Sequence, residues 1–318
     1  MLSRFIPGVL VRFFARPYVA GGSVDEALQC AAQVWNQRGL HSTLDLLGED
    51  VKKEEQVRAN LLTYRTVIRS SAEDTRVQGV QSSVSVKPSA FTVGGLEDSR
   101  SALEALAAFA RDHCVPLTID MEDRKWTDFT LDVSTSLFRR GFDVGTVLQT
   151  RLNRTEADLE SIPEGMRVRL VIGIYPEPKE VAVTDKTIMK ERMLQYARRL
   201  LERGAQVEFA THDEAYLERF AKDVAPVAPE RCEIQMLLGV PRDDTQHRLL
   251  SGAWGPALPV RLYVPFAVTW EDATAYLRRR MDESPSMILL VLRNLFRRGN
   301  PRAIPPSLSA RPEDSVMQ

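Results

Sequence analysis

The feature that most constrains this chain is the repeated alternation of short β-rich segments with longer helical patterns. The β-rich segments are 43–47, 84–87, 117–120, 145–149, 167–172, 206–210, 233–237 and 260–265. Helical patterns fill the gaps at 50–70, 96–111, 127–139, 156–161, 184–203, 213–221 and 243–250, and another follows at 271–283. Eight β-then-α units predict parallel strands joined by right-handed crossovers, and closing them into a (β/α)8 barrel leaves no exposed edge.

An open, doubly wound α/β sheet is the competing architecture for the same pattern. Such sheets commonly bind nucleotides through a glycine-rich loop after a strand. No predicted strand here leads into a G-x-G-x-x-G or G-x-x-x-x-G-K-[ST] loop. We therefore predict an α/β fold of the TIM-barrel type, with its functional side chains at the C-terminal ends of the strands.

The charge balance and the metal-binding residue types narrow the classes of function. The 42 Lys and Arg against 43 Asp and Glu leave a formal net charge of −1, so we expect no nucleic-acid partner. The three cysteines form no C-x-x-C pair, and the four histidines form no H-E-x-x-H motif. We therefore expect no metal site, no disulfide framework and a cytoplasmic location.

The predicted barrel spans residues 41–284 and is preceded by an N-terminal helical arm, residues 1–40. In residues 1–22 an apolar run is interrupted by Arg12, so it is too short and too charged for a signal peptide or a membrane span. A helix at 23–38 follows, and we expect it to cover the bottom of the barrel.

The region after the barrel has a different composition. Residues 285–299 predict an amphipathic helix that combines apolar residues with Arg293, Arg297 and Arg298. Such a helix either docks on the barrel or lies on a membrane surface, and the pattern is compatible with both. Residues 300–318 are rich in proline and serine, which predicts a disordered tail.

Polar side chains at the C-terminal strand ends are the candidates for chemistry, because those ends converge on one mouth. They are Glu49, Lys87, Asp120, Glu122, Gln149, Arg151, Tyr175, Thr211, His212, Gln235 and Tyr263. Arg169 alternates with Val168 and Leu170 and so lies on the opposite face of its strand. Either that face is the interior and the charge needs an anionic partner, or Arg167 and Arg169 both lie outside beneath a helix.

Lys87 and Asp120 follow neighbouring strands and have three interpretations. The ammonium binds a substrate anion, or the lysine forms a Schiff base with a carbonyl, or the two residues form a structural ion pair. The spacing does not choose among them.

The helix after the last strand carries a stripe of polar side chains. Tyr276, Arg279, Arg280 and Glu283 stand at i, i+3, i+4 and i+7. Two adjacent guanidinium groups suit a bidentate carboxylate ligand, and the alternative is a solvated basic face.

Taken together, nine motifs resemble the proline dehydrogenase family of flavin enzymes, which begin proline catabolism. The motifs are LDLLGE (44–49), SVK (85–87), IDMED (119–123), VGTVLQ (144–149), RLVIGIY (169–175), ATHDE (210–214), EIQML (233–237), RLYVP (261–265) and YLRRR (276–280). They run in family order and include one from each predicted strand. Each motif alone is weak, but the set is specific.

The resemblance implies a distorted (β/α)8 barrel with FAD across the strand ends and L-proline as substrate. The residues it implies for proline binding are Lys87, Tyr175, Leu237, Tyr263, Tyr276, Arg279 and Arg280. Those implied for FAD are Met121, Gln149, Arg169, Val171, Gly173, Thr211, His212 and Glu283. Asp120, which would orient Lys87, and Arg169 are the implied catalytic residues, and Glu49 would pair with Arg279 as a gate.

The reaction implied by the resemblance oxidises L-proline to 1-pyrroline-5-carboxylate. The two arginines would hold the substrate carboxylate, and Arg169 would stabilise the negative charge that develops on the flavin. A membrane quinone would accept the electrons, which gives the C-terminal helix a reason to contact the inner face of the cytoplasmic membrane peripherally.

The sequence departs from the family pattern in two places. Ile172 stands where many members have lysine, so one cofactor contact is expected to be lost, and the segment 266–276 differs in length and composition. We expect a monofunctional enzyme without an aldehyde dehydrogenase domain. The alternatives are a Schiff-base lyase built on Lys87 and a flavin- or carboxylate-binding module without turnover.

Overall fold

The computed structural model describes residues 18–269, 272–274 and 276. The first part of the predicted arm, the three stripe residues Arg279, Arg280 and Glu283, and the predicted segments 285–299 and 300–318 lie outside the described residues.

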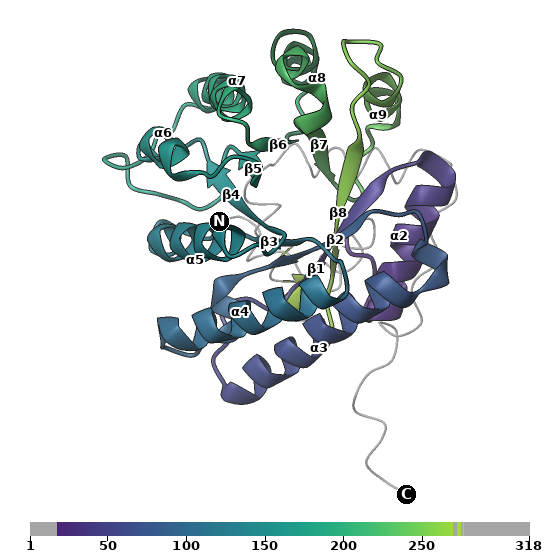
Figure 1. Ribbon diagram of the computed structural model, residues 1–318, viewed down its shortest axis with the longest axis vertical. Coiled ribbons are helices and arrows are strands. Elements are labelled where there is room, and N and C mark those ends of the chain that lie inside the picture. The colour runs from purple at the N-terminus through teal and green to yellow at the C-terminus, as the bar shows by residue number, and fades with distance from the viewer. Residues whose placement is uncertain (1–17, 270–271, 275, 277–318) are drawn as a thin grey trace, which may run out of the picture.

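Eight parallel strands close into a barrel in chain order (Figure 1). They are β1 (His41–Leu46), β2 (Ser82–Val86), β3 (Leu117–Ile119), β4 (Val144–Gln149), β5 (Arg167–Val171), β6 (Gln206–Ala210), β7 (Cys232–Leu237) and β8 (Val260–Phe266). The closing pair is β1 with β8, in parallel register from His41 opposite Arg261 to Leu46 opposite Phe266. The predicted TIM-barrel fold is confirmed.

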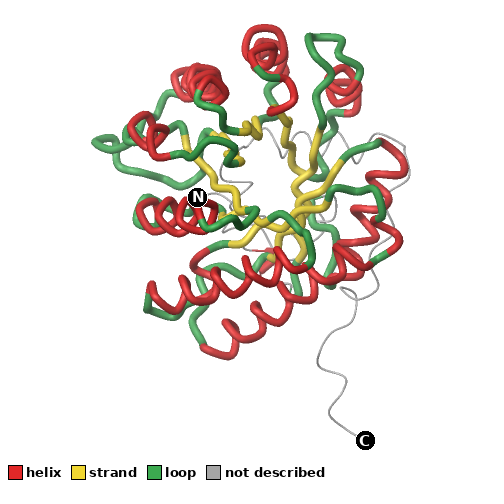
Figure 2. Tube along the Cα trace, in the orientation of Figure 1, coloured by secondary structure: helices red, strands yellow, loops and turns green. Residues whose placement is uncertain are grey.

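Helices surround the strands on the outside of the barrel (Figure 2). They are α2 (Val24–Arg38), α3 (Glu54–Glu73), α4 (Leu96–Asp112), α5 (Thr127–Arg139), α6 (Thr155–Asp158), α7 (Lys186–Glu202), α8 (Glu214–Arg219) and α9 (Asp243–Leu250). α3 begins later than predicted because Asp50 has a left-handed backbone (φ 55°) and donates its N–H to Ser89 Oγ at 3.0 Å. Within the described part of the chain, no helix is long and apolar enough to cross a bilayer.

Local signals explain where two of these helices begin and where one of them ends. At the start of α2, Ser23 Oγ accepts a hydrogen bond from the N–H of Glu26, and at the start of α7, Asp185 does the same for Thr187. α2 ends at Gly39, which takes the left-handed conformation (φ 65°) that favours glycine after a helix. These caps set the first residue of α2 and α7 and the last residue of α2.

Helix α2 lies on the flank of the barrel and not beneath its bottom. Ala20 N–H donates to Pro265 O (2.8 Å) and Ala267 N–H to Gly21 O (3.0 Å), so the chain enters α2 beside the C-terminal end of β8. α2 then packs against β8 and β1, in the ring of helices between α9 and α3 (Figure 1). The expectation that this helix covers the bottom was wrong, because its amphipathic pattern does not specify which gap in the ring it fills.

The two faces of the strands differ in chemical character. The outward face is apolar: Leu44, Val84, Ile119, Val168 and Phe209 are 0% exposed and belong to the core under the helices. Burying each such side chain contributes roughly 1.5–3 kcal/mol. Interior residues that make polar contacts across the barrel are Thr43, Ser83, Ser85, Thr118, Arg167, Arg169, Glu208, Gln235 and Arg261. TIM-barrel interiors are usually filled by branched apolar side chains, whereas hydrogen bonds and ion pairs cross the described interior of this one.

Candidate active site

Lys87 directly follows β2, and its ammonium contacts three side chains at the mouth of the barrel. Nζ lies 2.7 Å from Asp45 Oδ1, 3.3 Å from Tyr263 OH and 3.7 Å from Asp120 Oδ2. Burial is the largest single influence and would lower the pKa of Lys87, but Asp45 together with Tyr263, Asp120 and Tyr64 outweighs it, and the pKa is raised well above its ordinary value. Lys87 is therefore charged, and its closest partner is Asp45 rather than the expected Asp120.

Asp120 is the point at which three other side chains meet. Its Oδ1 accepts hydrogen bonds from Arg169 Nη1 at 2.6 Å and from Ser85 Oγ at 3.2 Å. Its Oδ2 accepts one from Tyr263 OH at 2.6 Å. Burial and the charge of Asp120 raise the pKa of Tyr263 well above its ordinary value, so the phenol keeps the proton that it donates.

Arg169 points into the barrel, which decides between the two interpretations of its strand. The residue is 5% exposed, and besides Asp120 it donates from Nη2 to Ser85 Oγ (3.1 Å) and from Nε to Gln235 Oε1 (2.5 Å). Its guanidinium also lies over the Tyr263 ring, 5.2 Å from the centroid. Contacts from several strands therefore hold this cation in one orientation.

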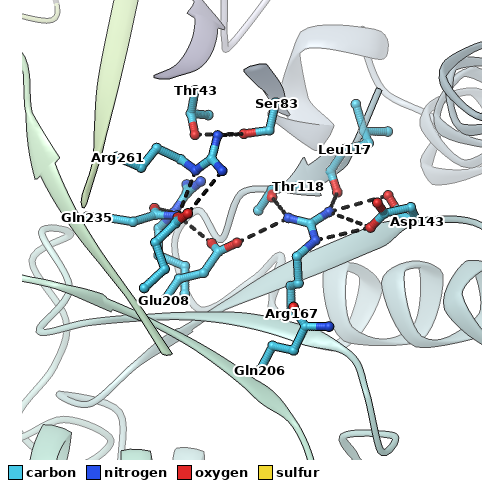
Figure 3. A network of polar contacts seen from close by, with 12 residues as sticks. Thr43, Ser83, Leu117, Thr118, Asp143, Arg167, Gln206, Glu208, Gln235 and Arg261 are labelled. Carbon is cyan, nitrogen blue, oxygen red and sulfur yellow. Dashed lines mark hydrogen bonds and ion pairs between the residues drawn. The ribbon is translucent and has the colours of Figure 1, made fainter. Parts of the chain in front are cut away.

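A second polar network fills the interior nearer the N-terminal ends of the strands (Figure 3). Arg167 donates to Glu208 Oε1 at 3.1 Å and to the carbonyl of Leu117 at 2.9 Å. Gly145 leaves room for this guanidinium, because a Cβ there would lie 3.3 Å from Arg167 Nη1 and 3.0 Å from its carbonyl oxygen. Arg261 forms the other part of the network with Glu233, at 2.7 Å.

The buried ion pairs of the described interior balance in charge. Each of four cations lies within 3.1 Å of a carboxylate, and the pairs are Lys87 with Asp45, Arg167 with Glu208, Arg169 with Asp120, and Arg261 with Glu233. Four positive and four negative groups leave no net charge. An anionic ligand at the mouth therefore needs further cations, since buried charges require compensation.

Glu122 is an acidic group at the rim of the mouth. It is 4% exposed, and its carboxylate accepts hydrogen bonds from Ser89 N (2.9 Å) and Ser89 Oγ (2.5 Å). Burial raises the pKa of Glu122 to about 7, although the bonds from Ser89 act in the opposite direction. This carboxyl group therefore changes its charge near neutral pH.

The ends of β4 and β5 form a cradle with an unsatisfied acceptor. Gln149 donates from Nε2 to the carbonyl of Glu122 at 2.7 Å, while its buried Oε1 has no hydrogen-bond partner within the described structure. Gly173 has φ 92°, and a Cβ there would lie 2.5 Å from Gln149 Oε1. A buried acceptor beside a position kept open by glycine suits a planar heterocycle that presents an N–H, such as the edge of a flavin ring.

The other described residues predicted to contact FAD lie after the neighbouring strands. Met121 is 8% exposed, and Val171 ends β5 half-buried. His212 Nε2 accepts a hydrogen bond from the N–H of Leu237 at 3.0 Å, which joins the ends of β6 and β7. Thr211, also half-buried, precedes this histidine.

The remaining described residues of the predicted site are Tyr175, Glu49 and Tyr276. Burial and Glu122 raise the pKa of Tyr175, so this phenol lies near the rim. Glu49 follows β1 and accepts a hydrogen bond from Gly48 N at 3.3 Å. Tyr276 is 6% exposed and lies close enough to Tyr18 that, after burial, it helps to raise the pKa of Tyr18 to about 12.

Sequence reasoning missed Asp45 and Ser85 and named Gln235 only as a strand-end candidate without a role. The structure places these three residues against Lys87 and Arg169. Asp45 carried a usable signal, because it stands between two buried leucines in a strand and so must face the interior. Ser85 carries none, because a serine in a strand has no preferred partner. No group of three or more His, Cys, Asp or Glu suited to a metal ion occurs among the residues that the structure describes.

Comparison with known proteins identifies the family. A family model described as proline dehydrogenase matches residues 28–287. The chain belongs to the proline dehydrogenase family. Among curated members of this family, proline dehydrogenase 2 of Bacillus subtilis (strain 168) is 30% identical over 295 residues, which cover 90% of this chain and 92% of that protein. Proline dehydrogenase of Deinococcus radiodurans is 29% identical over 296 residues, covering 89% and 90%.

A solved structure supports the same fold. Proline utilization A from Bdellovibrio bacteriovorus, inactivated by N-propargylglycine, aligns with a TM-score of 0.74 and 23% identity over 90% of this chain. This chain spans about a third (34%) of that much longer protein. As a member of the proline dehydrogenase family, the chain is an oxidoreductase that acts on proline.

Proposed function

We propose that this chain binds FAD and L-proline at the mouth of the barrel and oxidises L-proline to 1-pyrroline-5-carboxylate. The observation that carries the proposal is the contact of Lys87, Asp120, Arg169 and Tyr263 at the C-terminal strand ends. These are four of the residues that the family resemblance assigns to proline and its oxidation. A membrane quinone is the proposed acceptor of the electrons.

The described residues fit FAD at the ends of the central strands. Gln149 offers its buried acceptor, and Gly173 keeps the adjacent space open. Met121, Val171, Thr211 and His212 would line the cofactor, with Glu283 from outside the described residues. When bound, FAD would supply the acceptor of two electrons.

The substrate would bind through its carboxylate and its ring. Lys87 supplies a fixed ammonium for the carboxylate, and Asp120 keeps Arg169 and Tyr263 oriented beside it. Because the four described ion pairs already balance in charge, the proposal assigns the charge of the substrate carboxylate to further cations, Arg279 and Arg280. Tyr175, Leu237, Tyr263 and Tyr276 would surround the ring, and Glu49 would gate the site by pairing with Arg279.

The structure disfavours the alternative of a Schiff-base lyase. A lysine that attacks a carbonyl must be neutral, which requires a lowered pKa. The pKa of Lys87 is instead raised, because Asp45 and the other groups around the ammonium together outweigh the effect of burial. Lys87 is therefore a binding cation in this proposal and not a nucleophile.

The product tests the proposal directly. The purified protein is incubated with L-proline and a soluble quinone analogue, and o-aminobenzaldehyde traps any cyclic imine. We expect a coloured adduct that accumulates in step with quinone reduction, and none with pyrrolidine, which lacks the carboxylate. An adduct that fails to form, with a flavin-loaded protein, would refute the proposed reaction.

A membrane acceptor implies peripheral contact of a cytoplasmic enzyme with the bilayer through residues 285–299. Co-sedimentation with anionic lipid vesicles checks this part, since three arginines in that segment favour an anionic surface. We expect the full chain to sediment with the vesicles and a variant lacking residues 285–318 to stay in solution. Equal sedimentation of the two would contradict it.

A further inference from the structure

Gln235 of β7 lies between an acidic and a basic side chain inside the barrel. It is 4% exposed; its Oε1 accepts a hydrogen bond from Arg169 Nε at 2.5 Å, and its Nε2 donates to Glu233 Oε1 at 2.9 Å. Because a carboxylate only accepts and a guanidinium only donates, the amide can satisfy both neighbours in one orientation alone. Glu233 thereby determines which atom Gln235 presents to Arg169.

Glu233 is itself held from the other side. Arg261 of β8 donates to it twice, from Nε to Oε1 at 2.7 Å and from Nη2 to Oε2 at 3.0 Å. The third nitrogen of Arg261 donates to the carbonyl of Ser42 at 3.0 Å. This bidentate pair immobilises the carboxylate, and Figure 3 shows Arg261 and Gln235 within the same network.

Glu208 competes with Gln235 for Arg169. Glu208 Oε2 is buried, lies 3.7 Å from Arg169 Nε and makes no hydrogen bond within the described structure, while its Oε1 pairs with Arg167. In the sheet, Glu208 is opposite Glu233, and Gln235 lies two residues further toward the mouth. Gln235 therefore holds Arg169 toward the mouth, and Glu208 would draw it toward the bottom.

We propose that Gln235 is a positioning residue, which keeps the Arg169 guanidinium at the mouth against the attraction of Glu208. Glu233, held by Arg261, fixes the Gln235 amide for this role. The proposal rests on the proposed function, because the flavin and the substrate are what Arg169 is positioned for.

Replacing Gln235 by Leu removes the acceptor and keeps most of the volume. Arg169 then turns toward Glu208, and the flavin loses a positive charge held close to it. We expect anaerobic reduction of the flavin by proline to slow by about tenfold or more, and the midpoint potential of the flavin to fall. The matched control is Gln246→Leu, because Gln246 is equally buried (3% exposed) but lies on the outward side of β7, where it accepts a hydrogen bond from Arg38 and donates one to Met236 Sδ. In the control, the rate of flavin reduction should stay within twofold of the parent, and the midpoint potential should not change.

Coupling to Arg169 separates positioning from a general structural role. In an Arg169→Met background, Gln235→Leu should have no further effect on the reduction rate or the potential, since the group that it positions is gone. Effects of the same size in both backgrounds would overturn the proposal. Glu233→Gln changes little volume and serves as the second variant if Gln235→Leu does not fold; it should act in the same direction and also lose its effect in the Arg169→Met background.

Measurements on the parent protein distinguish a failure of the proposed function from a failure of the positioning role alone. A flavin-loaded parent that L-proline does not reduce would refute the proposed function and this inference with it. A parent that is reduced normally, with Gln235→Leu reduced at the parent rate and potential, would refute the positioning role alone.

Discussion

Lys87 and Arg169 carry positive charge into the barrel because a carboxylate on another strand lies against each of them. Asp45 is 2.7 Å from Lys87, and Asp120 is 2.6 Å from Arg169. Burying an unpaired charge costs several kcal/mol, whereas a hydrogen-bonded pair is tolerated. The same arrangement keeps both cations protonated and holds each in one orientation.

Lys87→Met should weaken proline binding by roughly 10- to 100-fold, because a charge-assisted hydrogen bond contributes about 1.5–3 kcal/mol. The single variant should also be less stable, since Asp45 loses its partner. The double variant Asp45→Asn/Lys87→Met should recover thermal stability but not proline binding. Proline affinity of the single variant within twofold of the parent would exclude Lys87 from the substrate site.

Glu122 should make stability depend on pH. Its folded pKa of about 7 lies above the ordinary value of 4.5, so the folded state binds the proton more tightly than the unfolded chain. The stabilisation is present below about pH 4.5 and is lost as the pH rises toward 7, by roughly 3 kcal/mol at about 1.4 kcal/mol per pKa unit.

Denaturant titrations of the parent and of Glu122→Gln between pH 4 and pH 8 check this. The amide resembles the protonated acid, so the free energy of unfolding of the variant should not decrease between pH 4.5 and pH 7 in this way. The variant should therefore be the more stable protein at pH 8. Parallel stability curves for the two proteins would show that Glu122 titrates normally.

At the level of strands and helices, the alternation of β-rich and helical segments in the sequence predicted most of the architecture. Each of the eight predicted strands overlaps an observed one, because an apolar outward face alternates with polar interior residues. The flank position of α2 was not predictable, since it depends on pairing between residues 20–21 and the end of β8. A local pattern contains no information on such long-range contacts.

The turn after β5 offers a test of the cofactor cradle. Gly173→Ala adds a Cβ that would lie 2.5 Å from Gln149 Oε1, and we expect the purified protein to lose most of its flavin. Gly141→Ala is the matched control, because Gly141 has a similar φ (85° against 92°) but nothing lies within 4 Å of an added Cβ. Both variants carry backbone strain, and only the first should lose flavin; equal flavin content in both would contradict the cradle.

For the whole molecule, the balanced interior is the property that individual motifs do not reveal. The strand pattern left open whether Arg169 faces the interior, and its observed partners come from β2, β7 and the end of β3. Which side chains meet across a barrel depends on register and closure, and neither can be read from one strand. The sequence therefore placed Lys87 and Asp120 together, and these lie 3.7 Å apart. It did not give the closer pairs, Lys87 with Asp45 and Arg169 with Asp120.

Because the four described ion pairs balance in charge, we expect proline binding to depend on the further cations Arg279 and Arg280. If Arg279 and Arg280 bind the carboxylate as proposed, Arg279→Ala or Arg280→Ala should raise the proline concentration needed for half-maximal flavin reduction by roughly 10- to 100-fold, the loss of one charge-assisted contact. The limiting rate should change less. If neither variant alters the proline requirement by more than twofold, these arginines are not the missing cations.

The most direct test of the account is the visible absorption spectrum of the purified protein without oxygen, before and after L-proline is added. A flavin enzyme with a carboxylate-binding mouth should show flavin bands that L-proline bleaches and that pyrrolidine leaves intact. A protein without flavin bands after FAD is supplied, or one whose bands persist at saturating L-proline, would contradict it.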